Sequence, residues 1–151
     1  MLSDLFSTDP DWTQTIIRLI LGVVFFAHGA QKLLGQRLPG SLGGPGLKST
    51  IDTMHRHLGL PVPLAFLAVA AEFLGGLGLI FGLLGRVAAV GIAVIMLAAV
   101  VMVHGRNGLF LNWFGDRKGH GYEYHLLAIA LAAVIVVRGS GAASLDRLFF
   151  N

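Results

Sequence analysis

The sequence has no cysteine and few charged side chains. Without cysteine the chain cannot form a disulfide, ligate an iron–sulfur cluster or shuttle thiols, so any thiol chemistry would belong to a partner. Charged residues make up 13% of the chain, whereas soluble domains carry roughly a quarter. Because 55% of the residues are hydrophobic and the mean hydropathy is +0.76, the composition predicts a protein that lies in the lipid bilayer.

Motifs for zinc and for phosphate are missing too, because the sequence has neither a His-Glu-x-x-His helix nor a phosphate-binding glycine loop. His55 and His57 stand at i and i+2, so on a helix their imidazoles would point to opposite faces. A haem held by two of His28, His104 and His125 would need ligands at equal depth, and His28 is expected to lie deeper. The net charge of +3 comes without a basic stripe interleaved with aromatics. We therefore expect no metal site and no nucleic-acid partner.

Long apolar runs dominate what is present. The runs cover about 15–34, 62–84, 87–103 and 122–138. A helix that crosses the hydrocarbon needs about 17–25 residues. The fourth run reaches that length only if its first residues form an interfacial turn, a place that suits the rings of Tyr122 and Tyr124. The pattern predicts an all-α integral membrane protein, a single domain with a four-helix bundle.

The longest connection, between the first two runs, begins with the glycine- and proline-rich segment 39–46, which should be a loop. After it, Leu47, Ile51, Met54 and Leu58 recur at helical spacing, with polar residues on the other faces. This pattern predicts a short interfacial helix that lies in the headgroup plane.

Three aspartates stand before the first run and Lys32 closes it, which favours a retained helix over a cleaved signal peptide. An even number of spans places both termini on the same side of the membrane. Lys and Arg are more numerous on the side of the two longer loops, and this bias favours a cytoplasmic location for those loops. We expect a multi-pass protein of the cell (inner) membrane.

Ionisable residues within or at the ends of the runs are the most informative. At about 100° per residue, Arg18, His28 and Lys32 fall within a sector of about 80° on one face of the first helix. A charge in hydrocarbon costs a few kcal/mol, so this stripe should face inward. Glu72 lies near the middle of the second run, at a depth that matches His28 in an antiparallel helix. We therefore predict a contact between His28 and Glu72.

This polar pair has two interpretations that spacing does not separate. An ion pair or hydrogen bond could simply fix how the helices meet. Alternatively, the pair could serve as a proton relay or quinone site, since a histidine and a desolvated carboxylate both exchange protons near neutral pH. Gly75 and Gly76 follow Glu72 directly. They favour close helix packing, and the same thin surface could admit a flat ring beside the carboxylate.

A second polar group is expected at the mouth of the bundle, on the side of the longer loops. His104 and Arg106 end the third run, and His120, Glu123 and His125 begin the fourth. Basic side chains in such a zone ordinarily extend to lipid phosphates, which accounts for Arg106. His104 and Glu123 fit that interpretation less well and are candidate ligand-binding residues.

The order and spacing of these residues resemble the DoxX family of small bacterial and archaeal membrane proteins. The matching segments are Arg18 to Gly22, His28 to Lys32, Gly59 to Pro61, Glu72 to Gly76, Gly82 with Arg86, His104, Asn107-Gly108, Glu123 and Ser144 to Asp146. The resemblance covers nearly the whole chain, and its strength lies in the order of the segments because no single motif is diagnostic.

The resemblance implies a four-helix membrane protein associated with oxidoreductase systems, such as a small subunit of a thiosulfate:quinone oxidoreductase or a membrane partner in redox-stress assemblies. The family's recurring polar residues, carried over by position, are Arg18, His28, Lys32, Glu72, His104 and Glu123. Their roles are expectations at this stage.

Two functions follow as hypotheses. In the first, the chain is a membrane subunit or anchor of a redox complex, at most a subunit of a quinone-linked oxidoreductase, with quinone in an intramembrane cavity. Glu72 and His28 would exchange protons with the carrier, while Arg18 and Lys32 stabilise anionic forms. In the second, the chain is a non-catalytic scaffold that recruits a soluble redox or stress-response partner through its loops.

A small transporter is a third hypothesis, and a weaker one, because four spans leave a narrow pathway unless subunits associate. Gly78 and Gly82 form a small-residue face that could serve a homodimer.

Overall fold

A computed structural model describes residues 6–150, and this part of the chain is all-α with no strand. Its α-helices are α2 (Trp12–Leu34), α3 (Leu47–Leu58), α4 (Val62–Phe81), α5 (Gly85–Ala99), α6 (Glu123–Arg138) and α7 (Leu145–Phe150). A π-helical segment (Val100–His104) and short 3₁₀ turns (Gly35–Arg37, Gly40–Leu42, Gly105–Asn107) complete the regular structure. The predicted fold class is confirmed.

Three helical segments of the described chain are long and apolar enough to cross a membrane. They are Trp12–Arg37, Val62–Phe81 and Gly85–Asn107, with mean hydropathies of 1.5, 2.1 and 2.6. The chain is therefore a multi-pass membrane protein. The run predicted at 122–138 does form a helix, but α6 has only 16 residues. At about 1.5 Å per residue it is shorter than the roughly 30 Å of hydrocarbon, so its crossing of the bilayer as a fourth span stays a prediction.

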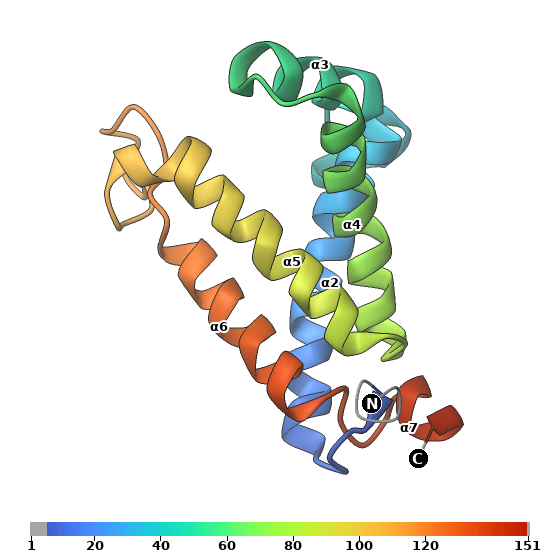
Figure 1. The fold of residues 1–151 in the computed structure, drawn as a ribbon. Helices are drawn as coiled ribbons and strands as arrows, with labels where there is room; N and C mark the ends of the chain where they lie inside the picture. The colour runs from blue at the N-terminus through green and yellow to red at the C-terminus, as the bar shows by residue number, and fades with distance from the viewer. Residues whose placement is uncertain (1–5, 151) are drawn as a thin grey trace.

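The helices pair into a V (Figure 1). Helices α2 and α4 run antiparallel in one arm, and α5 and α6 run antiparallel in the other. The arms meet at what we term the closed end, where α2 begins, α4 turns into α5 and α7 lies. They diverge towards the open end, where α3 lies and the loop 108–122 joins α5 to α6. The predicted short helix after the glycine-rich loop is confirmed as α3.

Glycines let the two helices of the first arm approach closely. A Cβ added at Gly76 would lie 2.3 Å from the backbone nitrogen of Phe26, and one added at Gly29 would lie 2.5 Å from the backbone of Phe73. Only glycine fits such a crossing without moving a helix. The predicted role of Gly76 in helix packing therefore agrees with its position between α2 and α4.

Arg18 ties the closed end together. Its side chain is buried, with 1% of its surface exposed. The Nε donates to the Ser140 carbonyl over 2.8 Å, and the guanidinium also donates to the carbonyls of Leu79, Ile80 and Ala143. These bonds join α2 to the end of α4 and to the segment that follows α6. A guanidinium in a bilayer must find such partners, and here they are backbone carbonyls.

Asp146 holds the turn between α4 and α5. Its buried carboxylate accepts from the backbone N–H groups of Leu84 and Gly85 over 2.7 and 2.9 Å and from the Ser140 hydroxyl over 2.6 Å. The N–H groups at the start of α5 have no partner within the helix, so the carboxylate caps it. Helix α4 ends before Gly82, whose φ of 65° stops the helix short of the predicted residue 84.

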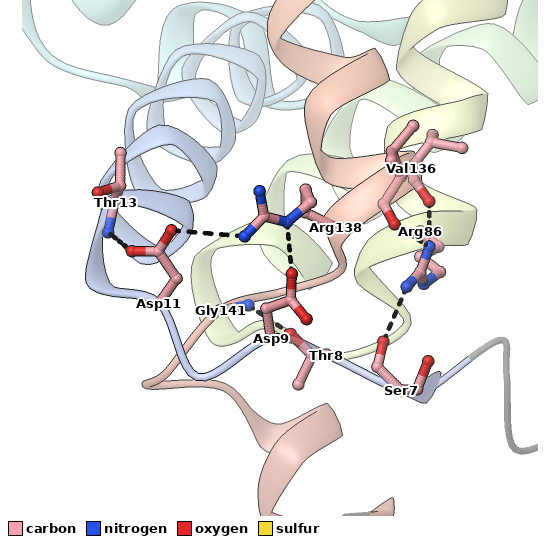
Figure 2. A network of polar contacts seen from close by, with 10 residues as sticks. Ser7, Thr8, Asp9, Asp11, Thr13, Arg86, Val136, Arg138 and Gly141 are labelled. Carbon is pink, nitrogen blue, oxygen red and sulfur yellow. Dashed lines mark hydrogen bonds and ion pairs between the residues drawn. The ribbon is translucent and has the colours of Figure 1, made fainter.

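A more exposed polar network surrounds this closed end (Figure 2). Arg138 at the end of α6 pairs with Asp9 and lies 4.0 Å from Asp11. Asp11 caps α2 by accepting from the Thr13 N–H over 2.8 Å. Arg86 reaches from α5 to carbonyl oxygens at the end of α6 and, over 3.0 Å, to that of Ser7. The segment before α2 is thus fastened to the second arm.

Candidate functional site

A cavity of about 1040 Å³ lies between the arms of the V, and helices α2 to α6 and the loop 108–122 all contribute to its lining. Most of its walls are apolar, including Phe25, Met54, Leu64, Leu67, Val94, Ile95, Met96, Met102 and Val103. A Cβ added at Gly91 in the α5 wall would meet nothing within 4 Å, so the glycine leaves open space in the cavity. Its polar lining comes from α2, α4, α6 and the segments that join α5 to α6.

On the α2–α4 wall, Lys32 and Glu72 form an ion pair. The Lys32 Nζ lies 2.5 Å from each carboxylate oxygen of Glu72. The Glu72 side chain is 3% exposed and that of Lys32 is 27% exposed, so the carboxylate is buried and the ammonium borders the cavity. Such a pair is strongly attractive in a medium of low dielectric constant, and removing one partner would leave a buried charge.

Lys32, rather than the predicted His28, is the partner of Glu72. Both residues lie on the same face of α2, one turn apart. The long apolar stem of lysine can follow the helix surface and deliver its ammonium to a carboxylate at a different depth. The imidazole of His28 has no comparable reach, and it lies exposed along the cavity wall.

Four rings form a row across the cavity, from His28 through Tyr124 and His125 to His104; we call this set the ring row. The distances between successive ring centroids are 6.3, 5.6 and 4.2 Å. The row runs from α2, through the first turn of α6, to the π-helical segment that follows α5. His28 is therefore placed against the α6 wall of the site.

Tyr124 and His125 carry buried polar atoms with no partner. Neither the Tyr124 hydroxyl nor the His125 Nδ1 has a hydrogen-bond partner among the described residues. The other atoms of this kind belong to Gln14, Thr50 and Arg86, none of which lines the cavity. Buried polar groups are almost always paired, so these two atoms are the strongest structural signal in the site.

His104 is held at the mouth of the cavity by the polypeptide that follows it. Its Nδ1 lies 2.8 Å from the His120 carbonyl, and the Asn107 side-chain amide donates to the same oxygen over 3.0 Å. A carbonyl only accepts, so Nδ1 carries the proton in this contact. The residue ends a π-helical segment, a conformation that recurs at functional sites.

Glu123 shapes the loop 108–122. Its carboxylate accepts from the Leu111 backbone N–H over 3.1 Å and from the Trp113 indole over 3.2 Å. Trp113 itself lines the cavity. Glu123 thus supports a wall of the cavity by way of the loop.

The predicted site residues divide into two groups. His28, Lys32, Glu72 and His104 line the cavity, whereas Arg18, Gly75, Gly76 and Glu123 are not part of its lining. Arg18 lies at the closed end, and Gly75 faces α5, where an added Cβ would contact Ile92 at 3.7 Å. The small-residue face is also used within the chain, because an added Cβ at Gly82 would lie 2.5 Å from Ser144.

Sequence reasoning did not single out the unpaired groups of α6. Tyr124 was interpreted as an interfacial aromatic and His125 as part of the polar mouth. A signal was available for His125, because it continues the buried face of Ala128, Ala132 and Ile135 at helical spacing. No signal in the sequence indicated that Gly91 leaves open space in the cavity, since glycine in a membrane helix ordinarily serves close packing.

The site thus combines an apolar chamber with a few polar groups. No cluster of three or more potential metal ligands occurs within residues 6–150. An ion pair, rings with unpaired atoms and apolar walls suit a lipophilic molecule that carries a small polar head.

Comparisons with known proteins identify the family of this chain. The family model described as DoxX matches residues 13–105, more than half of the chain. A Bacillus subtilis protein named "Putative oxidoreductase CatD" is 31% identical over 136 residues, which cover 90% of this chain and 86% of that protein. A Haemophilus influenzae protein named "Uncharacterized protein" is 31% identical over 138 residues, with 89% of each chain covered. No solved structure matches. By the family model and by these relatives, the chain belongs to the DoxX family.

Proposed function

We propose that this protein is a membrane subunit or anchor of an oxidoreductase system and that it binds a quinone, or a similar lipid-soluble carrier, between the arms of the V. The observation that carries the proposal is the cavity of about 1040 Å³, with apolar walls and a small set of polar groups. A quinone has matching parts, since its ring oxygens accept hydrogen bonds and its tail is apolar. The printed name of the Bacillus subtilis relative supports the link to redox chemistry.

The α2–α4 wall supplies groups that can hold and protonate such a ring. The Lys32 ammonium has one donor beyond the two engaged by Glu72, and it borders the cavity. When a partner reduces the quinone, protons must follow the electrons. His28 and Glu72 line the cavity and are the exchangeable groups of this wall.

The electrons would come from a protein partner of the redox system. The sequence has no cysteine for an iron–sulfur cluster or a thiol relay. We place the protein in the cell membrane with its longer loops towards the cytoplasm, where a soluble donor can reach the open end. This arrangement would explain why the polar lining of the cavity lies towards that end.

The two tryptophans offer a direct binding assay. Trp113 lines the cavity, whereas Trp12 begins α2 at the closed end. In a Trp12→Phe background reconstituted in lipid, a short-chain ubiquinone or menaquinone analogue should quench Trp113 fluorescence with saturation. In the matched Trp113→Phe background, quenching of Trp12 should rise linearly with the quinone dissolved in the bilayer. Equal, non-saturating quenching of both tryptophans would refute a site in the cavity.

The same assay tests the polar wall. Changing Glu72→Gln with Lys32→Met removes the ion pair without leaving an unpaired charge, and we expect about tenfold weaker binding, or about 1.4 kcal/mol. The control is Asp9→Asn with Arg138→Gln, which removes an exposed pair at the closed end and should leave binding unchanged. Unchanged affinity in the Glu72 and Lys32 variant would remove this wall from the proposal.

The alternative function is a scaffold that recruits a soluble partner. Its support is α3, on which Lys48, His55, Arg56 and His57 are exposed. In that case, charge reversal at Lys48 and Arg56 should abolish co-purification of the partner, and filling the cavity should not. The quinone proposal predicts that filling the cavity weakens quinone binding, whereas charge reversal at Lys48 and Arg56 leaves it unchanged.

A further inference from the structure

Two side chains that line the α6 wall of the cavity, Tyr124 and His125, each carry a buried polar atom that no described residue satisfies: the Tyr124 hydroxyl and the His125 Nδ1. His125 is 7% exposed, and it lies in the first turn of α6 beside Tyr124, with the two rings edge to face. An unpaired polar atom in a buried position is costly unless something in the cavity bonds to it. We infer that Tyr124 and His125 bind the ring oxygens of the carrier, and that they do so in both of its redox forms; this rests on the proposed quinone site.

The hydrogen-bonding chemistry of this pair differs from that of the opposite wall. A phenol hydroxyl both donates and accepts, and the Nδ1 of a neutral imidazole donates in one tautomer and accepts in the other. By contrast, the Lys32 ammonium only donates and the Glu72 carboxylate only accepts. A carbonyl oxygen needs donors, whereas the hydroxyl into which reduction converts it also needs an acceptor. Tyr124 and His125 can satisfy either form by rotating one hydroxyl and exchanging one tautomer.

The surroundings hold the two rings in place. His104 packs against His125 at 4.2 Å between centroids, and the His120 carbonyl fixes His104 in turn. On the other side, His28 lies 6.3 Å from Tyr124. The carrier's ring would therefore lie against α6, beside Tyr124 and His125 in the middle of the ring row. The apolar tail would extend between α4 and α5, where the open space at Gly91 admits it.

The decisive experiment measures both redox forms. Wild type and variants in lipid nanodiscs would be titrated by calorimetry under argon with a short-chain quinone, with its quinol and with an isoprenyl benzene that lacks ring oxygens. Tyr124→Phe removes one hydroxyl, and we expect it to weaken quinone and quinol binding about tenfold each. Isoprenyl benzene binding should not change, because the walls are intact. Tyr122→Phe is the matched control, since Tyr122 precedes α6 and does not line the cavity; it should leave all three affinities unchanged.

His125 is tested by loss and rescue. His125→Leu should weaken quinone and quinol binding to a similar degree. In His125→Asn the amide stands close to the place of Nδ1 and can donate or accept, so it should recover most of the affinity, whereas His125→Gln should recover less. The melting temperature of each variant, measured alongside, separates loss of binding from loss of folding. A purely structural role for His125 predicts no difference between the two amides.

The outcomes separate this inference from the function beneath it. If wild type binds neither quinone nor quinol, the proposed function fails. If wild type binds both and Tyr124→Phe binds them equally well, only the present inference fails. It is also overturned if Tyr124→Phe and His125→Leu lose one redox form and keep the other, or if the hydrocarbon competes as well as the quinone, which would indicate a lipid-chain site.

Discussion

At the closed end of the V, the Arg18 guanidinium donates to carbonyls from α4 and from the segment after α6, and the Asp146 carboxylate accepts from the turn between α4 and α5. At the open end, the Tyr124 hydroxyl and the His125 Nδ1 have no partner in the described chain, and His28 is exposed along the cavity. Both ends hold polar groups in an apolar bundle. The closed end, where the Gln14 Oε1 and the Arg86 Nε also lack a partner among residues 6–150, fixes the helices through Arg18 and Asp146. At the open end the unpaired atoms belong to residues that line the cavity, and we propose that they provide hydrogen-bonding capacity for a ligand.

The largest expected effect is at Arg18. Arg18→Met keeps an unbranched apolar chain but leaves the carbonyl of Ser140 buried without its donor, and the carbonyl of Ala143 also loses a hydrogen bond. We expect the free energy of unfolding to fall by about 3–5 kcal/mol, because several carbonyls lose a charge-assisted hydrogen bond at once and each buried one left unsatisfied costs about 1–3 kcal/mol. Denaturant titration in mixed micelles measures it. Arg147→Met is the control, because Arg147 is exposed; equal stability of the two variants would contradict the assigned role of the closed end.

A pair of glycines gives the next largest effect. In Gly76→Ala the added Cβ would lie 2.3 Å from the Phe26 backbone, so α2 and α4 must separate, at a cost of about 1–3 kcal/mol. In Gly91→Ala the Cβ meets nothing within 4 Å, and alanine favours the helix by up to about 1 kcal/mol. The difference in melting temperature between the two variants checks this. Similar destabilisation in both would mean that the cavity side of α5 is as tightly packed as the α2–α4 contact.

The sequence predicted the fold class because lipid leaves a chain few alternatives to helices. It predicted less well where helices end. The second run was expected to reach residue 84, but Gly82 adopts a left-handed conformation and ends α4 at Phe81. The fourth run was expected at 122–138, and α6 matches it from Glu123 to Arg138, with Tyr122 as the residue that precedes the helix.

The candidate site was predicted only in part, for a geometric reason. Helical periodicity gives the side of a helix on which a residue lies, and it correctly grouped Arg18, His28 and Lys32. It says nothing of where the partner helices end, so it did not separate Arg18, at the closed end, from the cavity. The partners of Lys32 and the unpaired atoms of Tyr124 and His125 depend on how the two arms diverge, and no local pattern encodes that angle.

A third variant tests the open end alone. Gly91→Leu should fill part of the cavity from the α5 wall without a clash, since nothing stands within 4 Å of its Cβ. We expect quinone binding to weaken about tenfold, equivalent to about 1.4 kcal/mol, while stability stays close to that of wild type. Saturating quenching of Trp113 gives the affinity. Ala98→Leu, which also adds volume from the α5 wall of the cavity, serves as a second test and should weaken binding in the same way. Gly78→Leu is unsuitable as a control, because an added Cβ there meets the Leu83 carbonyl at 3.0 Å.

The smallest effect should come from the exposed ion pair at the closed end. Arg138 and Asp9 form the ion pair drawn in Figure 2. They are each about half exposed, with 50% and 52% of their side-chain surface accessible. Water and salt screen such a pair, so Asp9→Asn should lower the free energy of unfolding only slightly, and by less in high salt. Denaturant titrations at low and high ionic strength measure this. A loss near that of Arg18→Met would show that a charged side chain stabilises the protein because it lies at the closed end, whether or not it is buried. A small, salt-sensitive loss would show that the stabilisation at this end comes from the buried Arg18 guanidinium and its hydrogen bonds to carbonyls.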